Sequence, residues 1–471
     1  MNAAQRIYAA STSEGETAFR LAEDLARRIE DDIASSDLPP GGALGSLREL
    51  SERYSVGRSV AREAMGLLER RGLGRLRPGP CGGFILAEPQ PDTIGEELAD
   101  HFRLAGVTLR QMLDAREAVD LMAARLAAAA DPPRAGLDRL QAASEMDDLS
   151  GRLAARVEIA RMAGEPILLL LVECLNSLTI DFGRADGARA SGSGRGPAGA
   201  AMIRALLGGD VKAAEAEAMR AHAELAGWLE ERSPRSEPVE ASRAPGTNGT
   251  LATGIARALA SEIVTSGSAG ARLGSEWDLC ERFNVSRLTL RQAIRLLEDS
   301  GLVECRRGRG NGLIVRDRRT AGAIRLVLAY LIGSKADPFA TGTILFQLNS
   351  FVPALAVGRA DPSQRRQLDA ALTRVEACDP FDRYDLLSLV HCVSRLADSP
   401  IIDLFSRCLA AYEARFRHTL AERLPASAQA SYFRLIRRLL DRPQVGSPAE
   451  MARSKMEASA LMLEMSRSRP L

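Results

Sequence analysis

The segment from residue 276 to residue 315, EWDLCERFNVSRLTLRQAIRLLEDSGLVECRRGRGNGLIV, decides the fold of this chain. Its first eight residues predict a short helix, with Ser275 as the N-cap and Asp278 in the capping-box position. A tight turn follows, and Ser286 can cap a second helix that runs to about Asp299. The second helix is predicted because apolar residues recur there at i, i+3, i+4 and i+7.

Another face of this predicted helix carries Arg287, Arg291 and Arg295, one every four residues, and we expect no acidic partner for them. A glycine ends the helix. Two short runs, 302–306 and 313–315, then predict two strands on either side of a basic, glycine-rich tip. Two short helices followed by a basic hairpin predict a winged helix-turn-helix.

An arginine-lined helix beside a basic hairpin suits DNA binding. A helix fits the major groove, and guanidinium groups can pair with guanine edges or with phosphate oxygens. The glycines of the tip let the backbone approach phosphates closely. The alternative is a winged helix that docks only onto proteins, with the arginines as a solvated face. DNA is favoured because the basic helix and the basic wing belong to one unit.

The same residues resemble a known family. SRLTLRQAIRLLE at 286–298, GLVE at 301–304 and RGRG at 307–310 resemble the DNA-binding domain of GntR-type bacterial transcription regulators. The resemblance implies that the chain binds a double-stranded DNA operator.

The motif occurs twice. Residues 45–86 align with residues 274–315 without a gap, at a shift of 229, and 18 of the 42 positions are identical. An amphipathic helix is predicted before each copy, at 18–37 and at 251–265. The repeat predicts a tandem duplication within one chain.

The two copies differ at positions where DNA would be contacted. The first copy has a capping box, Ser46 with Glu49, and keeps Arg48 where the family commonly has a phosphate-contacting arginine and the second copy has Trp277. Its wing has prolines instead of charges, and Gly57 replaces the capping serine. We therefore expect the first copy to be the weaker or differently tuned reader, with a purely structural role as the alternative. The residues that we predict to contact DNA are Arg48, Arg58, Arg62 and Arg77 in the first copy and Arg287, Thr289, Arg291, Arg295, Arg307 and Arg309 in the second.

Length and composition restrict the class of protein. A chain of 471 residues should hold three or four domains, and its formal net charge of +1 means that nucleic-acid affinity must come from local patches. Four histidines and six tyrosines leave little material for acid–base catalysis, and seven cysteines without a Cys-x-x-Cys pair indicate neither a zinc site nor a disulfide framework. Residues 1–17 do not resemble a signal peptide, and the longest apolar run, 166–172, is too short to span a bilayer. We therefore expect a cytoplasmic protein with no membrane association.

The region between the copies is predicted to be all-helical. Residues 109–127, 163–168 and 209–222 resemble the all-α effector (FCD-type) domain of FadR-like GntR regulators, which in many relatives holds a metal through one Asp and three His. The matching places here are Arg152, Arg156 and Gly199 or Ala200, and only His222 remains. One histidine cannot hold a divalent ion, so we predict no metal and no cofactor. The predicted helices are 93–105, 108–130, 136–149, 152–163, 165–182 and 199–230.

Arg116 is the charge of most interest in this bundle. It lies on a predicted helix otherwise rich in Ala, Leu, Val and Met, and in relatives an arginine here can meet a carboxylate ligand. A guanidinium offers a rigid bidentate fork for that purpose. The alternative is an internal ion pair with Asp120, at i+4 on the same helix. A small carboxylate is accordingly the effector that the resemblance implies.

The second copy is followed by a more diverged helical bundle. Residues 385–405 resemble the same effector domain, with His391 at one metal position and Leu348 where the first bundle has Arg116. The fold class is therefore mainly α, with two winged helix-turn-helix domains that are each followed by an all-α bundle. The predicted parts are a first winged helix at 18–90, a first bundle at 91–230, a linker at 231–250, a second winged helix at 251–318 and a second bundle at 319–467.

These patterns favour a sequence-specific DNA-binding transcription regulator built from two fused units. An interaction scaffold that does not bind DNA is one alternative, and an enzyme with a DNA-binding appendage is a less favoured one. Two winged helices in one chain predict an intramolecular pseudo-dimer on DNA, with a homodimer of tandem chains as the alternative. We expect the second winged helix to dominate the affinity.

Overall fold

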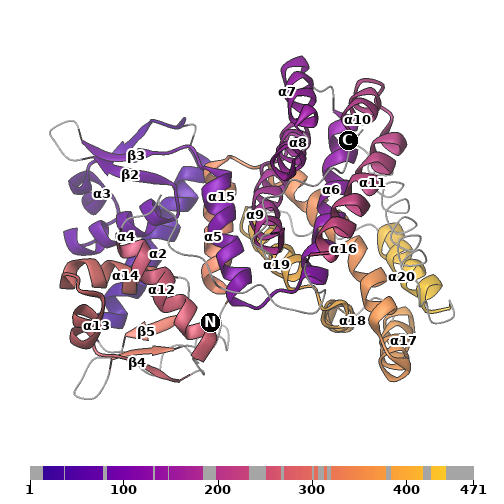
Figure 1. Ribbon diagram of the computed structural model, residues 1–471. Coiled ribbons are helices and arrows are strands. Elements are labelled where there is room, and N and C mark those ends of the chain that lie inside the picture. Colours follow the sequence, from indigo (N-terminus) through magenta and orange to yellow (C-terminus); the bar gives the residue numbers. More distant parts are fainter. Residues whose placement is uncertain are drawn as a thin grey trace. The chain divides into compact units, whose positions relative to one another are not determined.

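A computed structural model provides the structure of the chain (Figure 1). It describes residues 14–36, 38–77, 82–130, 133–146, 148–183, 198–232, 251–266, 270–299, 302–305, 312–315, 320–377, 383–416 and 426–441. The predicted linker at 231–250 lies almost wholly outside the described residues, as does the end of the chain from residue 442.

The first winged helix consists of helices α2, α3 and α4 and a three-stranded antiparallel sheet with the strand order β1-β3-β2. The two wing strands follow the predicted pattern. The third strand, β1, was not predicted, because three residues are too few to show the alternation of a strand. The elements are α2 (Glu14–Ser35), β1 (Ala43–Gly45), α3 (Leu47–Arg53), α4 (Arg58–Arg70), β2 (Gly74–Arg77) and β3 (Gly83–Leu86).

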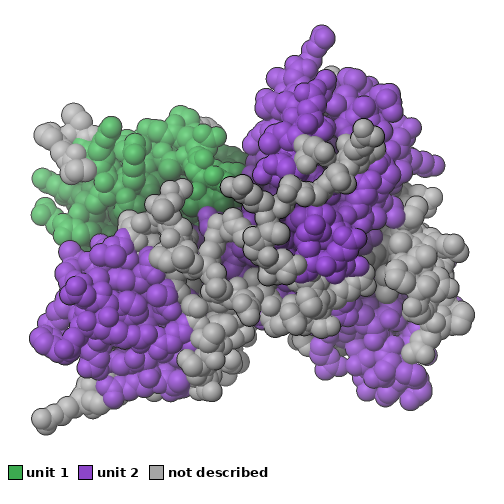
Figure 2. Space-filling model, in the orientation of Figure 1, with its two compact units in different colours: residues 1–94, 325–336 green, residues 95–324, 337–471 purple. Residues whose placement is uncertain are grey.

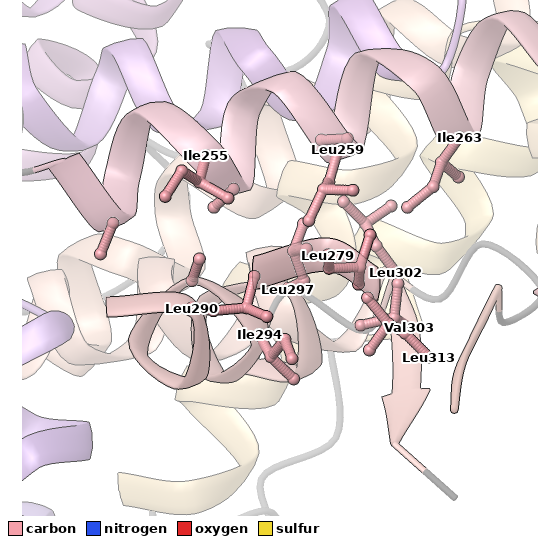
Figure 3. Close-up of a cluster of buried hydrophobic side chains, with 14 of the residues drawn as sticks. Ile255, Leu259, Ile263, Leu279, Leu290, Ile294, Leu297, Leu302, Val303 and Leu313 are labelled. Atoms are coloured by element: carbon pink, nitrogen blue, oxygen red, sulfur yellow. The ribbon is translucent and has the colours of Figure 1, made fainter. Parts of the chain in front are cut away.

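The second winged helix repeats this order of elements, with the strand order β4-β6-β5. One apolar core joins all its parts (Figure 3). Ile255, Leu259 and Ile263 extend from the first helix toward the apolar face of the third helix, residues 287–299, and toward the wing strands. The elements are α12 (Leu251–Ser266), β4 (Arg272–Gly274), α13 (Glu276–Phe283), α14 (Arg287–Asp299), β5 (Val303–Cys305) and β6 (Leu313–Val315).

A glycine at the start of the last strand is identical in both copies for a steric reason. A Cβ atom on Gly83 would lie 2.6 Å from the carbonyl oxygen of Gly45, and the same clash arises between Gly312 and Gly274. Only glycine lets the short first strand and the last strand pass this closely. The identity of the two copies at this position is therefore explained by the close backbone approach within each sheet, which excludes any residue with a Cβ atom.

Helices α5 to α11 follow the first winged helix, and α6 lies at the centre of their bundle, in contact with α8, α9, α10 and α11. The single helix predicted at 199–230 was wrong, because the structure divides it into α10 and α11. Gly209 has a φ of 61°, and Asp210 starts the next helix as an N-cap that accepts from the Ala213 amide. The helices are α5 (Pro91–Leu104), α6 (Leu109–Ala129), α7 (Arg134–Glu145), α8 (Leu149–Met162), α9 (Pro166–Gly183), α10 (Ala198–Leu207) and α11 (Val211–Glu230).

The last part of the chain is also helical over its described residues, with α16 in contact with α18, α19 and α20. Asp337 caps α16 by accepting from the Phe339 and Ala340 amides, and Pro338 occupies the first turn. The helices are α15 (Ala321–Gly333), α16 (Pro338–Arg359), α17 (Pro362–Ala377), α18 (Arg383–Ala397), α19 (Pro400–Phe416) and α20 (Ala426–Leu440).

Two helices, α9 and α16, are long and apolar enough to cross a membrane by length and composition alone. In the structure, 61% of the α9 window and 67% of the α16 window is buried within the protein. Burial on this scale is typical of the core helices of a bundle, so neither helix indicates a membrane span. The helix predicted at 165–182 is confirmed as α9, and most of its apolar run 166–172 is buried.

The chain divides into two compact units (Figure 2). One unit contains residues 1–94 together with residues 325–336, and the other contains residues 95–324 and 337–471. The first winged helix thus shares a unit with most of α15, a helix that follows the second winged helix in the sequence.

Within the second unit, the two helical bundles contact each other along α6. Asp114 on α6 accepts from Arg359 at the end of α16, and both side chains are 14% exposed. Arg110 and Gln111 each donate to the carboxylate of Asp398 at 3.1 Å. Phe102 on α5 and Phe405 on α19 add an aromatic contact with ring centroids 6.3 Å apart. This contact joins the two halves of the chain by both charged and apolar groups.

Candidate nucleic-acid interface

Local sequence fixes the second helix-turn-helix as predicted. Ser275 accepts from the Asp278 amide, and the Asp278 carboxylate accepts from the Ser275 amide at 2.9 Å, which completes the capping box. Asn284 ends α13 in the left-handed region with a φ of 50°, and Ser286 accepts from the Thr289 amide at the start of α14. The predicted helix starts and the predicted turn are therefore confirmed.

The recognition helix α14 presents Arg287 and Arg291 to solvent. The side chains of Arg287 and Arg291 are 63% and 61% exposed, at the first two turns of the helix. Thr289 lies between them in sequence, with its hydroxyl 2.9 Å from that of Ser286. A helix that enters a major groove uses the side chains of these first turns to reach base edges and flanking phosphates.

The expectation that these arginines have no acidic partner was wrong. Arg291 donates through Nε and Nη2 to both carboxylate oxygens of Glu276, the first residue of α13, and Arg287 Nη2 lies 3.9 Å from the same carboxylate. The hydrogen bond to Glu276 raises the pKa of the already basic Arg291 guanidinium. Helical spacing within α14 cannot reveal this partner, because Glu276 precedes Arg291 by 15 positions and lies on the other helix of the motif.

Two apolar side chains lie on the same helix-turn-helix. Trp277 on α13 is 66% exposed and Leu288 on α14 is 71% exposed. The corresponding residues of the first winged helix are Arg48 and Ser59, which are polar. The second copy thus has apolar surface where the first copy has a charge and a hydroxyl.

The first winged helix also exposes arginines, in a different electrostatic setting. Arg58 and Arg62 on α4 are exposed, and no hydrogen bond or ion pair joins either of them to another described residue. Leu47 occupies the position of Glu276, so the local acidic partner is missing here. Arg48 donates to Glu52 at 2.9 Å across one turn of α3. As predicted, α4 begins at Gly57 without a side-chain cap.

The remaining predicted contacts lie on or near the wings. Arg77 is exposed at the end of β2. The side chain of Arg295 and the whole of Arg307 and Arg309 lie outside the described residues. The structure therefore places Arg287, Arg291 and Thr289 together on one helix-turn-helix, and Arg48, Arg58, Arg62 and Arg77 on the other.

A second functional candidate lies inside the first bundle, around Arg116. Its side chain is fully buried, and its Nη2 donates to Asn176 Oδ1 at 3.1 Å. Nε and Nη1 have no hydrogen-bond partner among the described residues, and the nearest carboxylate oxygen of Asp120 is 3.8 Å from Nη1. Burial lowers the pKa of Arg116 to about 10, with Asp120 opposing and Arg156 reinforcing that shift. Unpartnered buried donors are costly, by about 1–3 kcal/mol each, so they commonly serve a purpose.

Asp120 instead accepts a hydrogen bond from Arg156. From the sequence alone, Arg156 is interpreted only as a residue that occupies the place of a metal ligand. Arg156 Nε donates to Asp120 Oδ2 at 2.9 Å, and its Nη2 donates to the carbonyl oxygen of Ala221 at 3.1 Å. One guanidinium thereby links α6, α8 and α11. His222, the only predicted remnant of the metal set here, is half-buried. No group of three or more His, Cys, Asp or Glu side chains that could hold a metal occurs among the described residues.

Comparison with known proteins agrees with the geometry of the two winged helices. Residues 21–80 and 251–312 each match the family model of bacterial regulatory proteins, gntR family. The two winged helices are thus GntR-type helix-turn-helix domains. Together these segments cover about a quarter of the chain, and they contain both recognition helices.

Three known proteins resemble parts of the chain. The HTH-type transcriptional regulator LutR of Bacillus subtilis is 30% identical over 131 residues, which cover 27% of this chain and 58% of LutR. The HTH-type transcriptional regulator Rv0494 of Mycobacterium tuberculosis is 32% identical over 138 residues, covering 29% of this chain and 56% of that protein. The chain therefore spans little more than half the length of these relatives. A solved structure, Streptococcus agalactiae GntR, aligns with a TM-score of 0.31 at 18% identity, over 44% of this chain and 99% of that one.

Proposed function

We propose that this chain is a sequence-specific DNA-binding transcription regulator in the cytoplasm, and that it uses both winged helices on one operator. The observation that carries the proposal is the exposure of Arg287 and Arg291 at the start of α14, repeated by Arg58 and Arg62 at the start of α4. Exposed guanidinium groups at the first turns of a recognition helix suit phosphate contacts and guanine readout. Since its relatives are named regulators, no enzymatic activity is proposed.

Selection of DNA from a random pool, followed by gel shifts of the full-length protein, tests this proposal. A selected site should bind about a thousandfold more tightly than random DNA of the same length. Affinity should fall steeply between about 50 and 200 mM salt, because phosphate contacts release counterions. Enrichment of no sequence, with weak binding that is insensitive to salt, would reject the proposal in favour of a scaffold.

We further propose that the two fused units form a pseudo-dimer within one chain. The ion pair between Asp114 and Arg359, the contacts of Arg110 and Gln111 to Asp398, and the aromatic contact across the bundles support this arrangement. Tethering raises the local concentration of the second unit to about the millimolar range, which favours pairing within the chain over pairing between chains. Light scattering of the complex with a short operator tests this: one chain per operator supports the pseudo-dimer, and two chains contradict it.

The two recognition helices are unlike, so the operator should also be asymmetric. Glu276 and Trp277 in the second copy replace Leu47 and Arg48 in the first. A pseudo-dimer with unlike contacts should prefer two unlike half-sites over a perfect palindrome. Strongest binding to a symmetrised site would contradict this asymmetry.

We propose a small carboxylate as the effector, bound at Arg116 in the first bundle. Two nitrogens of Arg116 have no hydrogen-bond partner in the described part of the chain, and this supports an anionic ligand, because a carboxylate would satisfy both the charge and the donors. Thermal-shift screening of short mono- and dicarboxylates tests the proposal. A stabilising compound should have no effect on Arg116→Met, whereas a control such as Arg139→Met, on α7 and half exposed, should respond like the wild type. Equal responses in both variants would exclude Arg116 as the site.

The exposed Trp277 and Leu288 support a second candidate function, in which the second winged helix docks onto a protein. The two functions predict different results when Trp277 and Leu288 are replaced by the residue types found at the corresponding positions of the first copy. Trp277→Arg with Leu288→Ser should tighten DNA binding if this face meets DNA, since it adds a cation near phosphates. Unchanged DNA binding in that variant would favour docking.

A further inference from the structure

Helix α15 follows the second winged helix in sequence and belongs with the first winged helix in structure. Residues 325–336 form one compact unit with residues 1–94, although the first bundle and the second winged helix lie between them in the chain (Figure 2). Three separate contacts within this unit hold the helix in place.

The first contact is made by Lys335. Its ammonium group donates to the carbonyl oxygens of Ile33, at 2.6 Å, and Ser36, at the end of α2. The last carbonyls of a helix lack partners within the helix and carry a partial negative charge, so a cation there is stabilising. Lys335 is directed by its own turn: its φ is 52°, and the next amide, that of Ala336, returns to the Leu331 carbonyl.

The second contact is a close approach at Gly333, the last residue of α15. A Cβ atom there would lie 2.6 Å from Cγ of Pro89 and 3.1 Å from Cδ2 of Leu73. Leu73 directly precedes strand β2, and Pro89 follows strand β3. The end of α15 therefore packs against the base of the first wing.

The third contact joins Arg325 of α15 to Glu23 of α2, beside the end of α4. Arg325 Nη1 lies 3.0 Å from a carboxylate oxygen of Glu23, and Arg71 Nη2 lies 3.8 Å from that same oxygen. Arg71 is the C-cap residue of α4, is 3% exposed, and donates to Glu30 at 2.8 Å. The carboxylate of Glu23 thus lies between two guanidinium groups. One belongs to Arg325 in the second half of the chain, and the other belongs to Arg71 at the end of α4.

We propose that this face of the first winged helix is a docking surface whose occupant is α15 of the same chain, and that α15 couples the second half to DNA reading by the first. The proposal rests on the DNA-binding function proposed above. Its physical basis is that residues 325–335 contact α2 at Glu23 and at its C-terminal end and pack against the base of the wing, while Glu23 also lies beside Arg71, the C-cap of α4. Residue 336 is the last of this segment in the unit, and the next residue along the chain is Asp337, the N-cap of α16.

Two variants of the full-length protein test the coupling. Lys335→Met removes the ammonium group and keeps the apolar stem, and Gly333→Val introduces the clash with Pro89 and Leu73. Matched controls are Arg366→Met, at an exposed position on α17, and Gly227→Val on α11, where a Cβ atom meets nothing within 4 Å. Hydrogen exchange of α2, α4 and strands β2 and β3 is measured without DNA, and affinity is measured on an operator with both half-sites.

Both test variants should raise exchange in α4 and in β2 and β3 at least about tenfold, and should weaken operator binding about 5- to 20-fold, while the controls match the wild type. Faster exchange confined to α15 itself, with residues 14–86 unchanged, would overturn the proposal. The proposal would also be overturned if dilution of the wild-type protein raised hydrogen exchange in residues 14–86 and light scattering showed a dimer. In that case α15 of a second copy would occupy the surface. If the wild-type protein bound no DNA, the proposed function would be rejected. The hydrogen-exchange measurements would then still test whether α15 docks on the first winged helix.

Discussion

Glu276 holds Arg291 in a two-point hydrogen bond across the turn of the second helix-turn-helix. In the first winged helix the position of Glu276 is occupied by Leu47, and Arg62, the counterpart of Arg291, has no partner among the described residues. The two matching motifs thus present corresponding arginines in two electrostatic states, restrained for Arg291 and unrestrained for Arg62.

A reciprocal exchange tests what this restraint does. Glu276→Leu should strengthen binding to random DNA about two- to tenfold at low salt, because it removes a negative charge from the surface that we propose to face phosphates. The ratio of affinity for the selected operator to affinity for random DNA should fall, because Arg291 loses the partner that orients it. Leu47→Glu should have the opposite effect on the first copy. If both substitutions change affinity in the same direction, the restraint is not what distinguishes the copies.

Removal of the arginines themselves should separate the two recognition helices. Arg291→Ala is expected to cost about 1–3 kcal/mol of operator binding and to relax sequence choice at its half-site, while Arg62→Ala should cost less. Fluorescence anisotropy with operators altered in one half-site at a time measures both effects. Equal losses for the two variants would contradict the expected dominance of the second winged helix.

The contact between the bundles should depend on the ion pair of Asp114 with Arg359. Since both side chains are mostly buried, Asp114→Arg alone should destabilise the second unit by about 3–5 kcal/mol, and Arg359→Asp should do the same. The double reversal should recover much of the loss. A double-mutant cycle from thermal or denaturant unfolding measures the interaction energy, and additive losses would show that the pair does not hold the bundles together.

Alkaline pH should destabilise the first winged helix through Tyr54. Its hydroxyl donates to Asp32 on α2, and burial, reinforced by that bond, raises the pKa of Tyr54 to about 12. An unfolded tyrosine ionises near pH 10, so this stabilisation is complete below about pH 10 and is lost as the pH rises toward 12. We expect a loss of about 1–2 kcal/mol after solvent screening is allowed for. Tyr54→Phe should flatten this part of the unfolding profile, and an unchanged slope in that variant would assign the effect elsewhere.

Chelation should leave the protein unaffected. Only His222 in the first bundle and His391 in the second match the ligand positions that the resemblance to FadR-like regulators implies, and one histidine cannot hold a divalent ion. Treatment with EDTA should therefore change neither the melting temperature nor operator affinity. A stoichiometric metal in the purified protein, with a melting temperature that falls on chelation, would contradict this prediction.

The sequence predicted those features that depend on neighbours along the chain. Capping boxes, the apolar stripe of α14 and the turn at Asn284 follow from spacings of three or four residues, and all are present. The split between α10 and α11 was signalled by Gly208, Gly209 and Asp210, a glycine pair followed by a capping residue, and was still missed because the apolar pattern continues on both sides.

Contacts between distant residues could not be predicted in this way. Arg156 was read only as a missing metal ligand, yet it bridges Asp120 and the Ala221 carbonyl across three helices. Lys335 donates to carbonyl oxygens at the C-terminal end of α2, about 300 positions earlier in the sequence. No periodicity links such residues, because their proximity depends on how whole helices pack.

If the two fused units pair within one chain, as proposed, the contact that Asp114 and Arg359 make between the bundles bears on the concentration at which the protein acts. A regulator that must dimerise before it binds occupies its operator in proportion to the square of its concentration when it is scarce. A chain that brings both halves together covalently has no such assembly step, so occupancy would rise in direct proportion to the number of chains. A cell could then control the target gene with few copies of this protein, and the response to a change in gene dosage would be linear.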